Sequence, residues 1–261
     1  MNILIMILAI LPGLLICYGI YRYDKYNREP AFHLAGCFLL GMAITYPAIQ
    51  IEWFAEQQGW EHDGGLGGLL LVAFIFVALN EELLKFLVVL IYPFPRSFFD
   101  EPLDGIVYAV VTSMGFATLE NVIYADQFGL ETTLVRSFTA VPAHAAFAVL
   151  GGYFIGKARF EKKNRFRLLF IGLMAAVIPH GVYDLFILQN YSEWIIALVL
   201  PLLGVSIYIS IRLIKLARLA SPFIKEQATN STDFTNSDVS LSNPEIASER
   251  NFNEQEGFEE E

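Results

Sequence analysis

The 261-residue chain lacks the short motifs that mark several large classes of enzyme. It contains no HExxH histidine pair, no GxSxG nucleophile turn and no P-loop glycine pattern. These absences exclude a zinc site on a single HExxH helix, an α/β-hydrolase serine nucleophile and a P-loop phosphate site. Cysteine is scarce as well, since Cys17 and Cys37 are the only two and neither has a CxxC or Cys/His spacing. We expect them to be small buried residues rather than a disulfide or metal ligands.

Charge is sparse outside the C-terminal end. The chain is 55% hydrophobic and its mean hydropathy is +0.50, which is too apolar for an ordinary soluble domain. The net charge is −10, and residues 222–261 hold ten acidic but only two basic residues. We therefore divide the chain into a membrane domain, 1–220, and an acidic tail, 221–261. The tail lacks apolar periodicity and is expected to be disordered.

Long apolar runs dominate the first domain. About 20 helical residues cross a hydrocarbon core of roughly 30 Å, at a rise of about 1.5 Å per residue. The sequence therefore predicts an all-α, polytopic membrane helix bundle of about seven transmembrane helices. The predicted spans are 3–21, 32–51, 66–92, 103–125, 134–156, 167–189 and 193–216.

Lysine and arginine mark one side of this bundle. The second, fourth and sixth loops contain neither residue, whereas the first, third and fifth loops and the segment after the last span all do. The positive-inside rule places the basic loops and the C-terminus in the cytoplasm and the N-terminus outside. No basic residue precedes the first run, which favours a membrane anchor over a cleaved signal peptide.

Several titratable side chains interrupt the apolar runs. A charge in hydrocarbon costs several kcal/mol, so such groups usually face a bundle interior or a wet cavity and have a function. Glu81 and Glu82 are adjacent, and Lys85 is close enough along a helix to pair with either, although we expect it to favour one. The groups come from four predicted helices and are Glu81, Glu82, Glu120, His144, His180 and Asp184.

The two histidines are candidate metal ligands. Each lies near a proline inside its run, and Asp184 shares a helix face with His180. Zinc accepts imidazole nitrogen and carboxylate oxygen, and a catalytic site uses three protein ligands. His144, His180 and Asp184 would suffice, or Asp184 would only orient His180. Glu81 or Glu82 would then remain as the general base. The alternatives are an intramembrane ion pair that fixes helix packing and histidines that are satisfied core residues.

The same residues fall into an ordered set of motifs. EExxK (Glu81, Glu82, Lys85), FxxxEN (Phe116, Glu120, Asn121), a histidine within a span (His144) and HxxxD (His180, Asp184) resemble the PrsW family of bacterial intramembrane proteases, over about residues 5–218. The resemblance implies a multi-pass peptidase of the bacterial cytoplasmic membrane. In the family, one role is the first, extracytoplasmic cut of a membrane-bound anti-sigma factor. It implies Glu81, Glu82 and His180 as catalytic residues, with Glu120 and His144 in the site.

The metal and the activity itself remain open at this point. The CAAX-processing and bacteriocin-immunity peptidases are also similar to the PrsW family. They have histidine where this chain has Glu120. In that wider group a glutamate and a histidine can activate water without metal. We therefore expect a zinc metallopeptidase, with a metal-independent glutamate-type peptidase as the alternative. The other interpretations of these buried polar groups are a proton- or ion-coupled transporter and an inactive scaffold. The expected partners are the lipid bilayer and a membrane-anchored protein substrate, and no nucleic acid.

Overall fold

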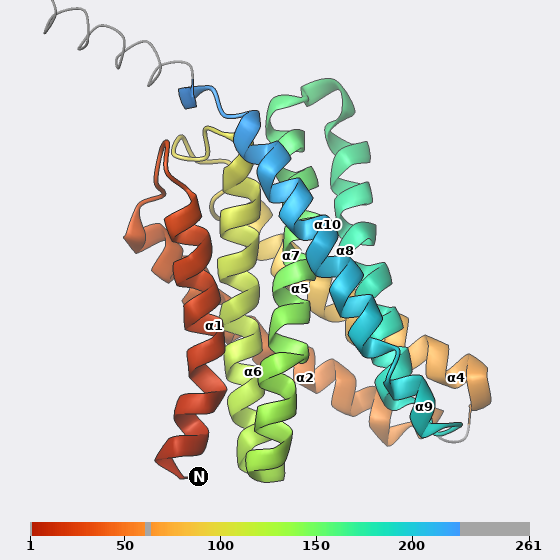
Figure 1. Cartoon of the computed structure of the whole chain (residues 1–261). Coiled ribbons are helices and arrows are strands. Elements are labelled where there is room, and N and C mark those ends of the chain that lie inside the picture. Colours follow the sequence, from red (N-terminus) through yellow and green to blue (C-terminus); the bar gives the residue numbers. More distant parts are fainter. Residues whose placement is uncertain (1, 61–63, 225–261) are drawn as a thin grey trace, which may run out of the picture. The chain divides into compact units, whose positions relative to one another are not determined.

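The computed structural model describes residues 2–60 and 64–224, and the chain up to Ser221 forms one compact unit. Regular structure within those residues is entirely helical (Figure 1). The predicted tail lies almost wholly outside the described residues, so its disorder stays a prediction. The elements are α1 (Ile3–Tyr23), α2 (Ala31–Gln57), α4 (Gly65–Leu71), η1 (Val72–Leu79), α5 (Asn80–Ile91), α6 (Pro102–Phe138), α7 (Ala140–Phe160), η2 (Lys162–Asn164), α8 (Arg165–Leu188), α9 (Glu193–Ile196) and α10 (Val199–Leu219).

The structure does not settle the number of membrane spans. Five helical segments of the described chain are long and apolar enough to cross a bilayer, and one of them, Pro102–Phe160, has 59 residues. That is about three times the ~20 residues that one crossing needs. The predicted span 66–92 is built from α4, η1 and α5, and none of these is long enough by itself. The chain is therefore a multi-pass helical membrane protein, while the count of seven and the orientation of the termini stay predictions.

The 59-residue segment turns back on itself at Gly129. This residue has φ 78° and ψ −158°, far from helical values, within α6. A Cβ on Gly105 would lie 2.4 Å from the carbonyl oxygen of Gly152 and 2.4 Å from the amide nitrogen of Gly156. Figure 1 shows α6 and α7 side by side. Glycine permits this close approach of two helix backbones, as small residues commonly do between membrane helices.

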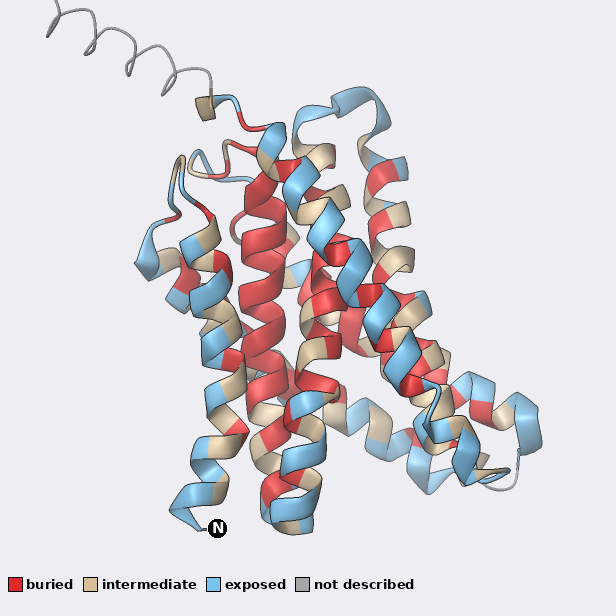
Figure 2. Ribbon diagram, viewed as in Figure 1, coloured by how far each residue is buried: buried red, intermediate tan, exposed pale blue. Residues whose placement is uncertain are grey.

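Burial is concentrated in the first half of α6, where every residue from Leu103 to Thr118 is buried. Figure 2 shows that helix segment almost entirely buried, whereas the outer faces of α1, α2 and α10 are exposed. The exposed side chains on these outer helices are mainly large and apolar, such as Leu14, Leu39 and Leu200. In water such a surface would aggregate, but it matches a hydrocarbon environment. The polar groups of the site consequently lie inside, between α5, α6, α7 and α8.

A π-helical segment directly precedes the two adjacent glutamates, whose side chains lie in the interior. η1 spans Val72–Leu79 and passes directly into α5 at Asn80. The Asn80 side chain donates a hydrogen bond from Nδ2 to the Ala48 carbonyl oxygen of α2 at 3.1 Å. π-Helical turns are rare and often occur at functional sites, where they change which side chains face inward. Here the turn precedes Glu81 and Glu82, which are 3% and 4% exposed.

Candidate active site

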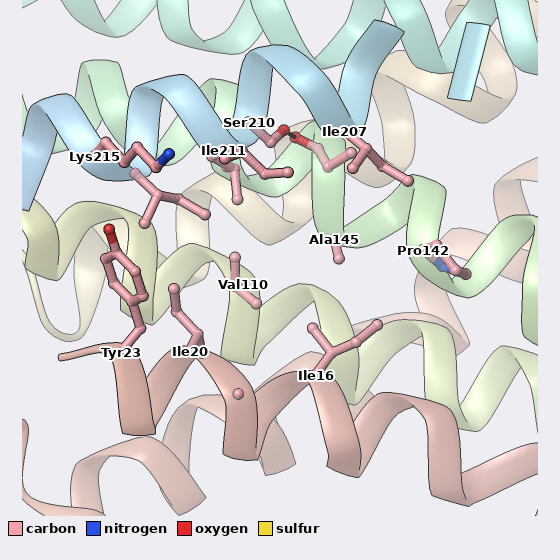
Figure 3. A pocket seen from close by; sticks show the side chains of 14 residues that line it. Ile16, Ile20, Tyr23, Val110, Pro142, Ala145, Ile207, Ser210, Ile211 and Lys215 are labelled. Atoms are coloured by element: carbon pink, nitrogen blue, oxygen red, sulfur yellow. Dashed lines mark hydrogen bonds between the residues drawn. The ribbon is translucent and has the colours of Figure 1, made fainter. Parts of the chain in front are cut away.

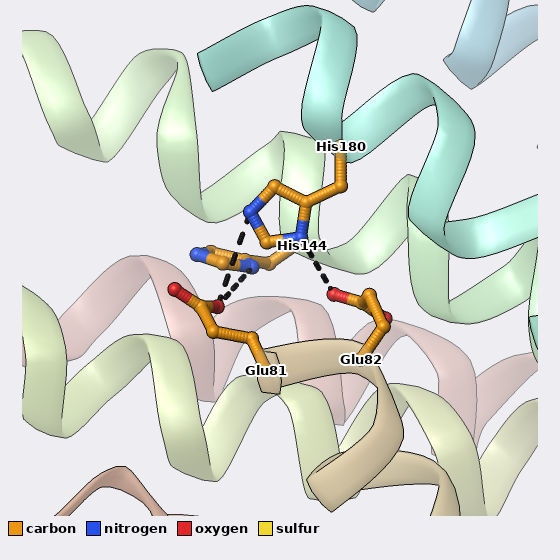
Figure 4. Close-up of side chains that lie close together, drawn as sticks. All are labelled: Glu81, Glu82, His144 and His180. Atoms are coloured by element: carbon orange, nitrogen blue, oxygen red, sulfur yellow. Dashed lines mark hydrogen bonds and ion pairs between the residues drawn. The ribbon is translucent and has the colours of Figure 1, made fainter. Parts of the chain in front are cut away.

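The titratable residues singled out from the sequence converge on one region of the bundle interior. Five of the six line a cavity of about 290 Å³: Glu81, Glu120, His144, His180 and Asp184. The sixth, Glu82, contacts His180 and does not line this cavity. Glu81, Glu82, His144 and His180 are all buried and each offers one ligand atom within 4.8 Å of the others (Figure 4). The six residues come from four helices, α5, α6, α7 and α8, and their roles stay predictions.

His180 is held between three carboxylates. Its Nδ1 lies 2.9 Å from Glu82 Oε1. Its Nε2 lies 3.3 Å from Asp184 Oδ2 and 3.9 Å from Glu81 Oε2. Glu82 therefore fixes one edge of the ring, and the other edge faces Glu81 and the cavity. The Phe147 ring stacks on the imidazole with centroids 5.3 Å apart, which restricts its rotation further.

His144 has the matching arrangement on α7. Its Nε2 lies 3.0 Å from Glu120 Oε2. Its Nδ1 faces Glu81 Oε2 at 4.0 Å. Each histidine thus has one nitrogen bound to a carboxylate and the other directed toward Glu81. This pairing fixes the orientation of an imidazole and strengthens it as a ligand or base.

Lys85 lies at the centre of the cluster. Its Nζ donates to Glu81 Oε2 at 2.8 Å and to Glu82 Oε1 at 3.0 Å, and it lies 3.2 Å from His144 Nδ1. The expectation that Lys85 would favour one glutamate is therefore wrong, because the long side chain reaches between the two. The Phe116 ring covers the ammonium at 4.1 Å. A buried charge needs such partners because its desolvation costs several kcal/mol.

Sequence reasoning missed two charged residues of the cavity, Glu52 and Arg136. Glu52 fell at the edge of a predicted loop, but α2 continues to Gln57 and carries it inward. Its Oε1 is buried without a hydrogen-bond partner among the described residues. Arg136 donates from Nη2 to Glu120 Oε1 at 2.8 Å, with its guanidinium 3.8 Å from the Tyr124 ring. The available signal was that both are charges within or beside an apolar run.

The cluster fits a zinc-like ion in its donor chemistry. Two imidazole nitrogens, His144 Nδ1 and His180 Nε2, face the same carboxylate oxygen of Glu81 at 4.0 and 3.9 Å. Carboxylates bind the remaining nitrogen of each ring, as is usual for metal-bound histidine. Lys85 contacts two of the same donor atoms, so its ammonium supplies the positive charge there in this structure. An ion would have to displace that ammonium by a rotamer change of the lysine.

Comparison with known proteins agrees with the motifs. Residues 29–212 match the family described as PrsW family intramembrane metalloprotease. Protease PrsW of Bacillus subtilis (strain 168) is 38% identical over 188 residues, which cover 72% of this chain and 84% of that protein. Protease PrsW of Clostridioides difficile (strain 630) is 34% identical over 206 residues, covering 77% and 85%. No solved structure matches the chain significantly. The chain therefore belongs to the PrsW family of intramembrane proteases.

Proposed function

We propose that this protein is an endopeptidase that hydrolyses a peptide bond of a membrane-anchored protein at the Glu81/Glu82/His144/His180 cluster. The observation that supports the proposal best is the convergence of four buried ligand atoms within 4.8 Å of one another. A transporter needs a relay of polar groups leading to both membrane faces. Here the groups gather instead around one cavity of about 290 Å³.

We further propose that the site holds a metal ion, with zinc as the expected ion. His144, His180 and Glu81 would hold it, because Glu81 Oε2 faces both imidazoles. Such an ion lowers the pKa of a bound water to about 7 and polarises the peptide carbonyl. Asp184, predicted from the sequence as a ligand, would have a different task, since it lies outside the group of four.

The remaining carboxylates would orient the two histidines or transfer protons. Glu82 and Glu120 hold His180 and His144 from their outer edges, which keeps the inner nitrogens directed at the cavity. Asp184 lines the cavity, and its buried Oδ2 lies 3.3 Å from His180 Nε2 but makes no hydrogen bond among the described residues. A carboxylate so placed can accept a proton from the attacking water and return it to the amine that leaves. Glu81 would share this work in a metal-free mechanism, which Lys85 in its observed position would favour.

The substrate is proposed from the family and the membrane setting. An active site inside a multi-pass membrane protein would act on substrate segments that are themselves in or near the bilayer. A membrane-bound anti-sigma factor cut on its extracytoplasmic side, in the bacterial cytoplasmic membrane, is the substrate class that the family resemblance implies.

The test is cleavage of a co-expressed membrane-anchored substrate by wild type and by the variants Glu82→Ala and His180→Ala. Loss of the cleaved product in both variants is expected. His33→Ala is the matched control, because His33 lies away from the cluster and contacts Tyr92 at 2.9 Å. Unchanged cleavage in both variants would overturn the proposal.

Metal content separates the two mechanisms. Elemental mass spectrometry on detergent-purified protein should find close to one zinc per chain in wild type and in His33→Ala. We expect much less in His144→Ala and in His180→Ala, because each would lose one ligand. A wild-type protein that remains metal-free after zinc is added, yet still cleaves its substrate, would establish the metal-free mechanism.

A further inference from the structure

An open groove of about 370 Å³ runs between α1 and α10, on the other side of α7 from the cavity (Figure 3). Its walls are almost entirely apolar and include Ile16, Val110, Ala145 and Ile211. Away from the end that Tyr23 and Lys215 line, the polar wall residue is Ser210, which donates its hydroxyl hydrogen to the Ala146 carbonyl oxygen at 3.1 Å. The groove therefore offers an apolar surface between its ends, where Ser210 is already hydrogen-bonded.

One end of this groove is cationic. Among the described residues, Lys215 is the only charged one in the groove wall, and Figure 3 shows it at the same end as Tyr23. Within residues 2–60 and 64–224, no hydrogen bond or ion pair engages the Lys215 ammonium. Arg218 adds a second positive charge nearby, with its guanidinium 4.8 Å from the Tyr23 ring. The sequence places this end on the cytoplasmic side, where anionic lipids attract basic residues.

The position of α7 argues against a substrate peptide in the groove. Pro142, Ala145, Ala146 and Val149 line the groove, whereas Ala140, Ala143, His144 and Phe147 line the cavity. At about 100° per residue these two sets occupy opposite faces of one helix. A peptide in the groove would be separated from the catalytic cluster by the whole width of α7.

We propose that the groove binds one phospholipid of the cytoplasmic leaflet, with an acyl chain along its apolar walls and an anionic phosphate at Lys215. A single chain matches an open, apolar channel that lacks hydrogen-bond donors for a peptide backbone. The phosphate would supply the counter-charge that no described residue gives to Lys215. Because α7 also carries His144, a bound lipid would stiffen the helix that forms one wall of the active site.

The test uses the full-length protein in nanodiscs of phosphatidylcholine with a minor fraction of phosphatidylglycerol, and native mass spectrometry of the lipids that remain bound. Wild type should retain one phosphatidylglycerol in preference to phosphatidylcholine. Lys215→Gln should reduce that preference about fivefold, the factor expected for one lysine near a phosphate at the membrane surface. Lys162→Gln is its control, since Lys162 is an exposed basic residue outside the groove.

A second pair of variants tests the apolar walls. Gly19 lines the groove, and a Cβ there would meet no heavy atom within 4 Å, so Gly19→Leu fills the groove without a backbone clash. Gly204 on α10 has the same open surroundings but does not line the groove, so Gly204→Leu is the matched control. Gly19→Leu should remove the retained lipid while Gly204→Leu keeps it.

Two outcomes would overturn the proposal. Equal retention of both lipids by wild type and by Lys215→Gln would mean that the groove does not select a headgroup with a net negative charge. Loss of substrate cleavage in Gly19→Leu, with phosphatidylglycerol still bound, would make the groove a docking site for a substrate helix. Thermal unfolding of each variant in detergent checks that it is folded. If Lys215→Gln or Gly19→Leu does not fold, the other variant and its control still test the proposal.

Discussion

Lys85 shows, at the scale of one residue, how this protein keeps charges inside a membrane. Its ammonium lies within 3.0 Å of both Glu81 and Glu82. Three buried charges thereby become a compact group with a single net negative charge, and His180 adds a hydrogen bond to Glu82. Removing Lys85 would leave two buried carboxylates without their counter-charge, and breaking a buried ion pair in this way typically costs about 3–5 kcal/mol. The sequence motif EExxK is therefore a structural unit as well as a candidate catalytic one.

Arg136 is expected to act on the reaction through Glu120. Its Nη2 lies 2.8 Å from Glu120 Oε1, and Glu120 holds His144 through the other oxygen at 3.0 Å. Loss of a partner that orients a histidine in this way commonly lowers activity or metal affinity by about 10- to 100-fold. We therefore predict that Arg136→Gln lowers kcat within that range with a smaller effect on KM, and that Arg136→Lys recovers part of the loss.

The measurement is the rate of substrate cleavage in detergent or liposomes. Arg212→Gln is the matched control, because Arg212 also contacts a tyrosine, with its guanidinium 5.5 Å from the Tyr208 ring, but lies away from the site. Equal rates in Arg136→Gln and wild type would show that Glu120 holds His144 without help from the arginine.

The sequence predicted the residues of the cluster better than their surroundings, and the reason lies in individual elements. Glu81 and His180 interrupt apolar runs, and the cost of a charge in hydrocarbon makes such residues visible in the sequence alone. Arg136 meets Glu120 because the chain reverses at Gly129, inside the predicted loop 126–133, but the apolar pattern does not show which side chains meet across that turn. Glu52 was missed because hydropathy ends a helix at the membrane boundary, whereas α2 continues to Gln57.

The reversal at Gly129 yields a prediction at the scale of one element. A residue with φ 78° and ψ −158° occupies a region that is essentially restricted to glycine, and side chains forced into it cost about 1–3 kcal/mol. Gly129→Ala is therefore expected to lower the free energy of unfolding by about that amount. It should also weaken activity, since Arg136 follows the turn.

Denaturant unfolding in mixed micelles measures the effect. Gly67→Ala is the control, since Gly67 lies within helix α4 and a Cβ there meets no heavy atom within 4 Å. Alanine in a helix is more favourable than glycine by up to about 1 kcal/mol, so this control should be neutral or more stable. A Gly129→Ala protein as stable as the control would mean that the turn adopts a different backbone conformation.

At the scale of the whole molecule, a second group of buried carboxylates joins parts of the chain that are far apart in sequence. The loop after α1 contributes Asp24 and Glu29, and the start of α6 contributes Glu101, all of them 3% exposed or less. Glu29 accepts a hydrogen bond from the Tyr108 hydroxyl, and Glu101 accepts one from the Ser221 hydroxyl. This group therefore ties the first loop and the end of the compact unit to the central helix.

The pH dependence of stability should reveal this group. Burial raises the pKa of Glu29 and Glu101 to about 7 and that of Asp24 to about 6. The nearby Asp100 carboxylate raises all three pKa values further. The Arg218 guanidinium partly offsets the rise at Glu101 and Asp24. A carboxyl whose pKa is raised in the folded state binds a proton more tightly there than in the unfolded chain. Its stabilising contribution is complete below the unfolded pKa of about 4.5 and is lost as pH rises to about 7.

The thermal unfolding midpoint should consequently fall as pH increases from about 5 to 8, and Glu29→Gln should flatten that slope because glutamine keeps the buried shape without the proton. The catalytic cluster titrates in both proteins, so the difference between them isolates Glu29. Glu56→Gln, at an exposed site on α2, is the control and should leave the slope unchanged. If Glu29→Gln and wild type lose stability in parallel across this range, Glu29 is ionised throughout and its contact with Tyr108 is a bond to a carboxylate.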